Sequence, residues 1–197
     1  MTNELPKKKA EKAKKHISDK DVLVEVQDNI REMQLRTLFN LRSGGTSRIG
    51  HDARDNFDNP FELKTTTKNS VTTARDVGPH TLEKWRGRYW ICAKGRNMPA
   101  GFVIEEIYFL SPSMMKEWID SIEARFKPDL ELLESVLDIL RQSEFETSKE
   151  ERLEYLVKRG ITLNNPKISW HYVKSNGIQI TANHARRLRH LVRQNPL

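Results

Sequence analysis

Hydrophobic residues recur with a helical spacing in the first part of the chain. Between Asp21 and about Leu41 the apolar positions predict a helical region, in one or two pieces, and the flexible segment 42–47 ends it. The apolar stripe is larger than a short surface helix needs, so we expect residues 21–45 to form a dimerisation region. Residues 1–20 are rich in lysine and almost free of large apolar groups, which predicts a flexible arm.

Alternating and helical patterns follow each other along the rest of the chain. A hairpin is expected around residues 52–67, a loop over 69–79 and a short helix over 81–86. Apolar runs predict buried strands over 88–94 and 102–110, with a turn at 96–99 between them. Further helices are expected up to about residue 126 and over 129–142, 150–159 and 183–194, with short strands over 168–173 and 177–181. This order predicts an α/β (α+β mixed) fold, with a central mixed β-sheet flanked by helices.

Composition restricts the class of protein. The chain has 197 residues, of which 37% are hydrophobic and 31% charged, and it has no apolar run of the ~20 residues that cross a bilayer. Its basic N-terminus lacks the apolar stretch of a secretory signal. The single cysteine, Cys92, cannot form an internal disulfide, and it lies in an expected buried strand, where a packing role is predicted. We therefore expect a cytoplasmic protein with no membrane partner.

Charge is distributed unevenly along the chain. The net charge is +7, residues 1–20 hold seven lysines, and residues 129–154 carry nine acids against three bases. The terminal helix adds basic residues at Arg186, Arg187, Arg189 and Arg193. This segregation indicates a polyanion partner on one face. Two interpretations of the terminal helix stay open, a clamp on nucleic acid and a solvated basic face.

The segment from Asp52 to Lys64 carries the candidate chemistry. Residues i and i+2 of a strand share a face, so Glu62 and Lys64 project together while Leu63 turns into the core. Turn-forming residues 55–60 would fold the chain back and bring Asp52 beside Glu62. Two carboxylates suit Mg²⁺, which keeps water and takes phosphate oxygens as its remaining ligands, and Lys64 would hold or deprotonate the attacking water. A Glu-x-Lys pair is also common on exposed strands, and two other acids of the hairpin, Asp55 and Asp58, compete for the role of Asp52.

Several separate blocks occur in the order that is typical of one family. With them the chain resembles type II restriction endonucleases of the PvuII kind, in the PD-(D/E)XK nuclease superfamily. The blocks are Gln27-Asp28-Asn29, Gly50-His51-Asp52-Ala53, Phe61-Glu62-Leu63-Lys64, Lys84-Trp85-Arg86 with Tyr89-Trp90-Ile91, Ile104-Glu105-Glu106-Ile107-Tyr108 and Asn164-Asn165-Pro166-Lys167-Ile168.

The resemblance implies roles for individual residues. Asp52 and Glu62 correspond to the metal-binding carboxylates, with the Leu63 carbonyl as a third ligand, and Lys64 corresponds to the lysine beside the attacking water. A group of residues is expected to contact DNA, and it comprises Asp28, Thr73, Arg75, Asp76, Lys84, Asn164, Asn165 and Lys167. Trp85 stands where the relative has a tyrosine near the active site, so a hydroxyl role is lost there. Ile49 stands where an acid is expected.

One departure concerns recognition of the target. Where the family has a histidine-rich segment, this chain has Thr72-Thr73-Ala74-Arg75-Asp76. Arginine can donate two hydrogen bonds to guanine, and aspartate can accept one from cytosine N4. Arg75 and Asp76 are therefore predicted to read a G·C pair, so that the target differs from the relative's. The alternative is that the two residues form a local salt bridge.

Together these features predict a homodimeric, Mg²⁺-dependent endonuclease that cuts a short palindromic sequence in double-stranded DNA and leaves 5′-phosphate and 3′-hydroxyl ends. A companion methyltransferase is expected in the host, not as a bound partner. The expected organisation is a basic arm (1–20), a dimerisation and DNA-approach region (21–45) and a catalytic and recognition domain (46–197) with an acidic helical insertion at 128–160. Two rivals are a structure-guided repair or resolving nuclease of the same superfamily and a basic DNA-binding protein without catalysis.

Overall fold

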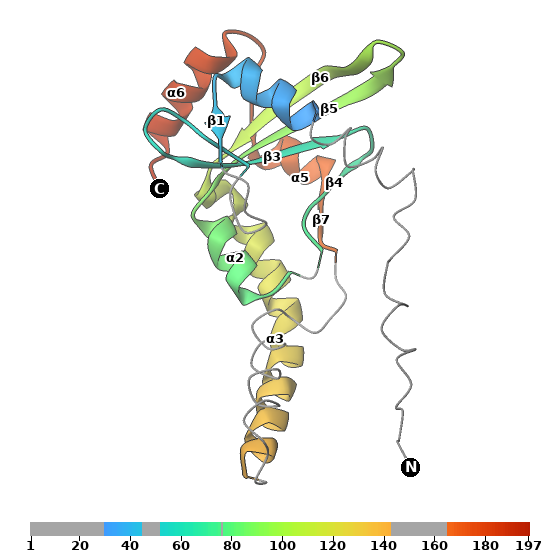
Figure 1. Cartoon of the computed structure of the whole chain (residues 1–197), viewed down its shortest axis with the longest axis vertical. Coiled ribbons are helices and arrows are strands. Elements are labelled where there is room, and N and C mark those ends of the chain that lie inside the picture. Colours follow the sequence, from blue (N-terminus) through green and yellow to red (C-terminus); the bar gives the residue numbers. More distant parts are fainter. Residues whose placement is uncertain (1–29, 45–51, 76, 143–164) are drawn as a thin grey trace, which may run out of the picture.

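A mixed β-sheet lies at the centre of the protein. The computed structural model describes residues 30–44, 52–75, 77–142 and 165–197. The strand order in the sheet is β1-β2-β3-β5-β6-β8, and β3 runs parallel to β5 while the other neighbours are antiparallel (Figure 1). The strands are Arg42–Ser43 (β1), Ala53–Arg54 (β2), Pro60–Thr66 (β3), Tyr89–Met98 (β5), Gly101–Leu110 (β6) and Ile178–Gln179 (β8). The predicted mixed sheet is therefore confirmed.

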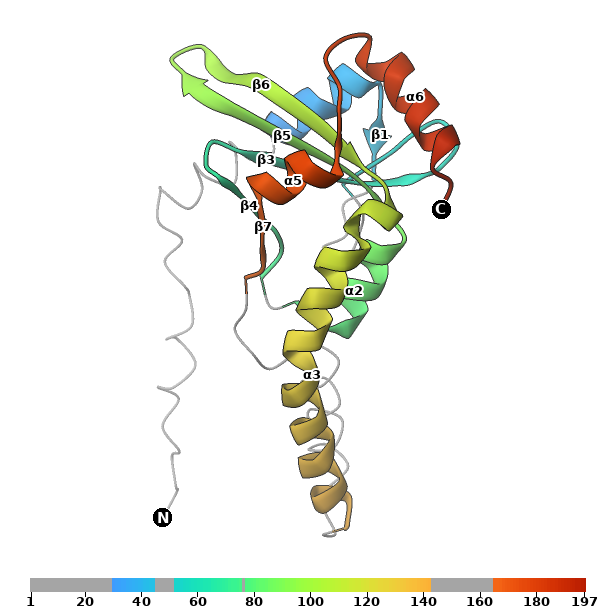
Figure 2. The same cartoon turned by 180° about the vertical axis from the view of Figure 1, so that it is seen from behind.

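Helices cover both faces of this sheet. Residues 30–39 are helical and lie on one face together with α6, while α5 lies on the other face, as the two opposite views show (Figures 1 and 2). Helix α3 packs against α2 and extends away from the sheet (Figure 1). These helices are Pro79–Arg86 (α2), Pro112–Gln142 (α3), Trp170–Asn176 (α5) and His184–Gln194 (α6).

Two hydrophobic clusters follow from the alternation of side chains along the strands. On β3, Phe61 and Leu63 are fully buried in one cluster, which includes Leu35 of helix 30–39 and Leu188 of α6. The other cluster joins the opposite face of β5 to α2, α3 and α5. Because successive residues of a strand point to opposite faces, Glu62 and Lys64 lie on the side away from the first cluster.

The acidic helical region differs from its expected form. We predicted one helix ending near residue 126 and another over 129–142, but α3 is continuous from Pro112 to Gln142 and contains Pro128 in its interior. Proline removes one backbone hydrogen bond and can bend a helix without ending it where both flanks keep a helical pattern. The prediction of two separate helices on either side of this proline was wrong.

Three shorter elements also differ. The expected loop over 69–79 contains β4 (Ser70–Thr72), which pairs with β7 (Lys167–Ser169) in a second, two-stranded sheet. The expected turn at 96–99 begins later, because β5 continues to Met98. The expected strand over 168–173 ends at Ser169, whose side chain accepts a hydrogen bond from the N–H of Tyr172 and caps α5. An N-terminal cap of this kind favours a helix over a continued strand.

Some expectations lie outside the described residues. They concern the basic arm 1–20, the first part of the 21–41 helical region and the helix over 150–159. The expected division at residues 45 and 128 stays a prediction. Within the described residues, no helix is both long enough and apolar enough to span a bilayer.

Candidate active site

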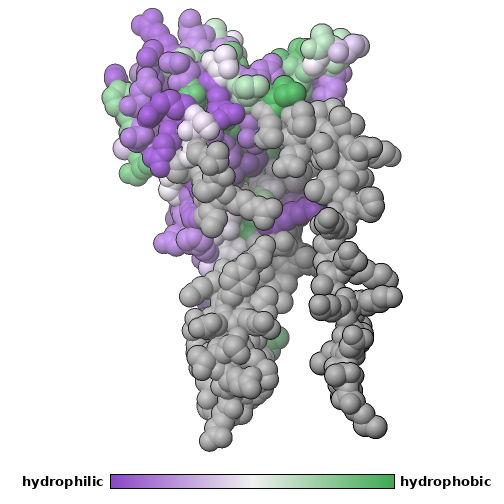
Figure 3. Space-filling model, viewed as in Figure 1, coloured by the Kyte–Doolittle hydropathy of each residue, from purple (hydrophilic) through white to green (hydrophobic). Residues whose placement is uncertain are grey.

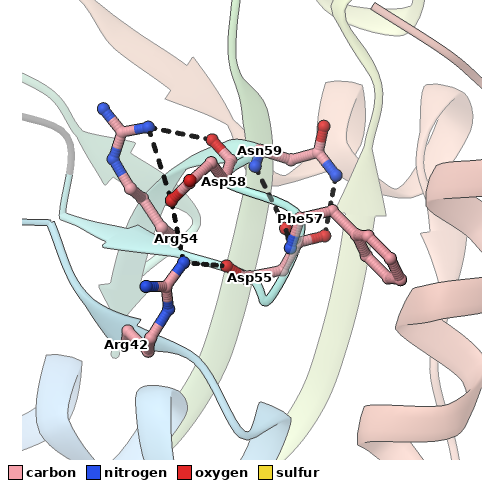
Figure 4. A network of polar contacts seen from close by, with 6 residues as sticks. All are labelled: Arg42, Arg54, Asp55, Phe57, Asp58 and Asn59. Carbon is pink, nitrogen blue, oxygen red and sulfur yellow. Dashed lines mark hydrogen bonds and ion pairs between the residues drawn. The ribbon is translucent and has the colours of Figure 1, made fainter.

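A tight turn shapes the hairpin between β2 and β3. One carboxylate oxygen of Asp55 accepts hydrogen bonds from the backbone N–H groups of Phe57 and Asn59, at 2.8 and 3.0 Å, and the other accepts from the Asn59 side chain (Figure 4). Asp58 has a positive φ of 65° and forms an ion pair with Arg42 at 2.8 Å. Asp55 is thus engaged within the turn itself, and Asp58 is engaged with Arg42 of β1.

The hairpin brings Asp52 to Glu62 and Lys64. The N–H of Asp52 donates to the carbonyl of Phe61, which fixes the register next to β3. Oδ2 of Asp52 accepts from the Leu63 N–H at 2.7 Å and lies 3.2 Å from Nζ of Lys64. The same Nζ lies 2.8 Å from Oε1 of Glu62. One ammonium group therefore joins the two carboxylates, as the spacing of the three residues predicted.

Burial and charge set the protonation of this cluster. Burial raises the pKa of Asp52, and the attraction of Lys64 offsets this only in part. Burial also opposes ionisation of Glu62, but Lys64 and Arg88 outweigh it and lower its pKa. For Lys64, burial favours the neutral amine, yet the nearby carboxylates of Glu62 and Asp52 dominate and raise its pKa. Lys64 is therefore a cation in this arrangement, paired with both carboxylates.

Two charged neighbours of the cluster were missed in the sequence. Nη1 of Arg88 lies 2.5 Å from Oε2 of Glu62, and both side chains are less than one-tenth exposed, at 8% and 7%. Glu32 of helix 30–39 is half-buried, and burial together with the negative charge of Asp52 raises its pKa to about 7. Arg88 lies two and four residues before Trp90 and Cys92, so it shares their face of the sheet. This spacing could have identified Arg88 once β5 had been placed beside β3. No local pattern marks Glu32.

The donor set of the cluster suits a small hard cation. Among the described residues, no three acidic, histidine or cysteine side chains gather closely enough to hold a metal alone. Mg²⁺ does not require such a cage, because it is commonly held by one or two carboxylates, water and substrate phosphates. Asp52 and Glu62 fit that requirement. The expected role of the Leu63 carbonyl as a further ligand stays a prediction.

The expected recognition segment lies beside a distant part of the chain. In the small sheet, Thr72 of β4 is the register partner of Lys167 of β7. The buried hydroxyl of Thr73 donates to the carbonyl of Pro166 at 2.5 Å, so Thr73 joins the two segments and is not open to solvent. Arg75, Asn165 and Lys167 are exposed. Three expected DNA contacts therefore lie on or next to one small sheet and are accessible.

The remaining expected contacts are scattered or outside the described residues. Lys84 is half-buried on α2 and makes contacts within the protein. Asp28, Asp76 and Asn164 lie outside the described residues. The arginines of α6 are exposed on the helix that covers the Phe61 face, where the surface is largely hydrophilic (Figure 3). Their contact with DNA stays a prediction.

The core accounts for other residues that the sequence singled out. Trp85 is 2% exposed and packs against Trp90 and Trp118, with ring centroids 5.4 and 5.6 Å apart. It thus fills the core between α2, α3 and the sheet. Cys92 is fully buried, and burial raises the pKa of its thiol to about 12, in agreement with a packing role.

Two carboxylates and a lysine that meet beside a mixed sheet are the arrangement of nucleases of the PD-(D/E)XK class. The family model for restriction endonuclease PvuII matches residues 7–135, and the chain belongs to this family. It is therefore a type II restriction endonuclease, that is, a site-specific deoxyribonuclease that acts on DNA. The family match favours this interpretation over a repair or resolving nuclease and over a DNA-binding protein without catalysis. No curated protein matches the chain.

Proposed function

We propose that this restriction endonuclease uses Mg²⁺ to cut both strands of a short palindromic DNA sequence and leaves 5′-phosphate and 3′-hydroxyl ends. The observation that carries the proposal is the position of Lys64, whose Nζ lies 3.2 Å from Asp52 and 2.8 Å from Glu62. A cation held between two carboxylates serves a reaction in which negative charge develops on a phosphate.

Each residue of the cluster has a separate task in this proposal. Asp52 and Glu62 hold the Mg²⁺, which when bound neutralises phosphate charge and makes a water molecule more acidic. Lys64 orients the attacking water by donating a hydrogen bond and stabilises negative charge on the phosphate oxygens. Its raised pKa, which the two neighbouring carboxylates produce, supports this donor role. The hydrogen bond from the Leu63 N–H keeps Asp52 aimed at the same point.

The recognition surface proposed here is the small sheet of β4 and β7 with its flanking residues. Arg75, Asn165 and Lys167 are exposed there, and the Thr73–Pro166 hydrogen bond holds the two segments together. Arg75 is proposed to read guanine together with Asp76, while Lys167 contacts phosphate. A long arginine side chain on a fixed support is suited to two parallel hydrogen bonds with one base.

A homodimer is proposed because a palindromic site is two-fold symmetric and is matched most simply by a two-fold symmetric protein. Each subunit would then cut one strand. Helix 30–39 buries Leu35 and Phe39 in its own chain but leaves Ile30 and Met33 about half exposed, at 52% and 53%. These two apolar side chains are the proposed centre of the contact between subunits.

The test is digestion of long bacteriophage DNA with Mg²⁺ by the wild type, Glu62→Ala and Asp58→Asn. Asp58 lies in the same hairpin and is engaged with Arg42, so its variant controls for damage to the hairpin. Discrete fragments from the wild type and Asp58→Asn, but not from Glu62→Ala, support the proposal. Sequencing of the fragment ends then gives the site and the end chemistry. A smear, or equal cleavage by Glu62→Ala, would contradict it.

A further inference from the structure

Arg88 enters the catalytic cluster from the residue just before β5. It follows the end of α2, where its N–H donates to the carbonyl of Trp85, and directly precedes Tyr89, the first residue of β5. Tyr89 belongs to the cluster on the Phe61 face, so alternation places Arg88 on the other face, the one that also presents Glu62. The parallel pairing of β3 with β5 then brings the two side chains together.

The Arg88–Glu62 pair is buried and unusually close. Nη1 of Arg88 lies 2.5 Å from Oε2 of Glu62, while Oε1 of the same carboxylate faces Lys64 at 2.8 Å. Removal of charges from water is costly, and a buried ion pair is weak evidence for a gain in stability. Glu62 already has a cationic partner in Lys64. A second one therefore calls for a role other than holding the fold.

Charge counting shows what Arg88 changes in the cluster. Asp52 and Glu62 contribute two negative charges, while Lys64 and Arg88 contribute two positive charges, so these four side chains sum to zero. A divalent cation is attracted less strongly to this set than to the same set without Arg88, which would carry a net charge of −1. It must also share Glu62 with the guanidinium, which occupies one of the two carboxylate oxygens. The same guanidinium restricts the carboxylate to one orientation.

We propose that Arg88 is a positioning residue of the catalytic centre, which orients Glu62 and competes with the divalent metal for it. This inference rests on the metal dependence in the proposed function. Arg88 thereby lowers the affinity of the free enzyme for Mg²⁺ in exchange for a fixed metal-binding carboxylate. Removal of Arg88 therefore has opposite effects on metal binding and on catalysis. Mg²⁺ binding becomes tighter, while the chemical step becomes slower.

The experiment is calorimetric titration of Mg²⁺ into free protein, without DNA, for the wild type, Arg88→Met, Arg88→Lys and Arg86→Met. Arg86 is the matched control, because it pairs with Asp120 and Glu123 on the protein surface and not with the cluster. Arg88→Met is expected to bind Mg²⁺ at least about tenfold more tightly than the wild type. Arg88→Lys, which keeps the charge, and Arg86→Met are expected to remain within about threefold of it.

Cleavage kinetics supply the second readout. Arg88→Met is expected to need less Mg²⁺ for half-maximal cleavage and to have a lower kcat at saturating Mg²⁺. Unchanged or weaker Mg²⁺ binding by Arg88→Met would overturn the inference and leave Arg88 a structural residue. If Arg88→Met does not fold, Arg88→Gln decides the question by the same titration, because it removes the charge and keeps an N–H donor. Failure of the proposed function is recognised separately, by Mg²⁺ binding that does not change in Glu62→Ala.

Discussion

Nζ of Lys64 lies 3.2 Å from Oδ2 of Asp52, although eleven residues and a complete turn separate the two along the chain. The contact closes the β2–β3 hairpin on the side of the candidate active site. It also explains why the pKa of Lys64 is raised despite burial, since Glu62 and Asp52 both face the ammonium group. The ammonium group of Lys64 is thus held in place by carboxylates of its own hairpin.

Substitution of Lys64 by methionine is expected to lower kcat by about 10²- to 10³-fold, because one preorganised donor toward developing charge is lost. Lys68→Met is the control, since Lys68 is exposed in the turn after β3. Single-turnover cleavage of plasmid DNA measures the effect. More than a tenth of wild-type activity in Lys64→Met would show that the lysine is not needed for the chemical step.

Glu32 predicts a pH dependence of stability. Its pKa is raised from 4.5 to about 7, so the folded protein holds a proton between these values that the unfolded chain has released. The free energy of unfolding therefore falls as pH rises through this window. Above the window, the folded protein bears the full free-energy cost of keeping the half-buried Glu32 carboxylate ionised. Glu32→Gln removes this cost, because glutamine does not ionise.

The expected gain in Glu32→Gln is on the order of 1–2 kcal/mol at about pH 8, with little difference at about pH 4, in metal-free buffer. Denaturant unfolding at the two pH values measures it. Glu83→Gln serves as the exposed-carboxylate control, because the side chain of Glu83 is 83% exposed. A gain of equal size at both pH values would rule out ionisation of Glu32 as the cause.

Local spacing was sufficient to predict that the β2–β3 hairpin brings Asp52, Glu62 and Lys64 together. Turn-forming residues between Asp52 and Glu62, and the shared face of Glu62 and Lys64, depend only on neighbours in the chain. Arg88 could not be assigned in the same way, because its contact with Glu62 requires the parallel pairing of β3 with β5, which no local pattern specifies. Glu32 depends on how a helix lies across the sheet. Long-range packing, and not composition, placed both residues.

Two of the elements that were predicted wrongly have different causes, one local and one long-range. Trp170–Val173 has the apolar and aromatic composition of a strand, but Ser169 caps a helix at that point. Ser70–Thr72 was expected to be a loop because it is polar, and it becomes a strand by pairing with a segment almost a hundred residues away. Tertiary context decides the state of such short segments.

Arg75 is expected to determine guanine preference at one position of the target. Arg75→Ala should reduce discrimination there by ~1–3 kcal/mol, about 5- to 150-fold. Cleavage of a library with randomised target positions, read by sequencing of the ends, measures the change. Lys68→Ala is the control, since it removes an exposed positive charge outside the recognition segment and should leave the sequence preference unchanged. An unchanged cleavage profile in Arg75→Ala would favour the local salt bridge with Asp76.

The exposed apolar side chains of helix 30–39 predict where two subunits meet. Ile30 and Met33 are 52% and 53% exposed, whereas Leu35 and Phe39 of the same helix are buried within the chain. Charges at the two exposed positions, in Ile30→Glu/Met33→Glu, should weaken the dimer at least about tenfold without unfolding the core. Light scattering after size exclusion measures the mass. Leu132→Glu on α3 is the matched control, because Leu132 is also exposed, at 67%. A double variant that stays dimeric, or a control that becomes monomeric, would move the interface away from this helix.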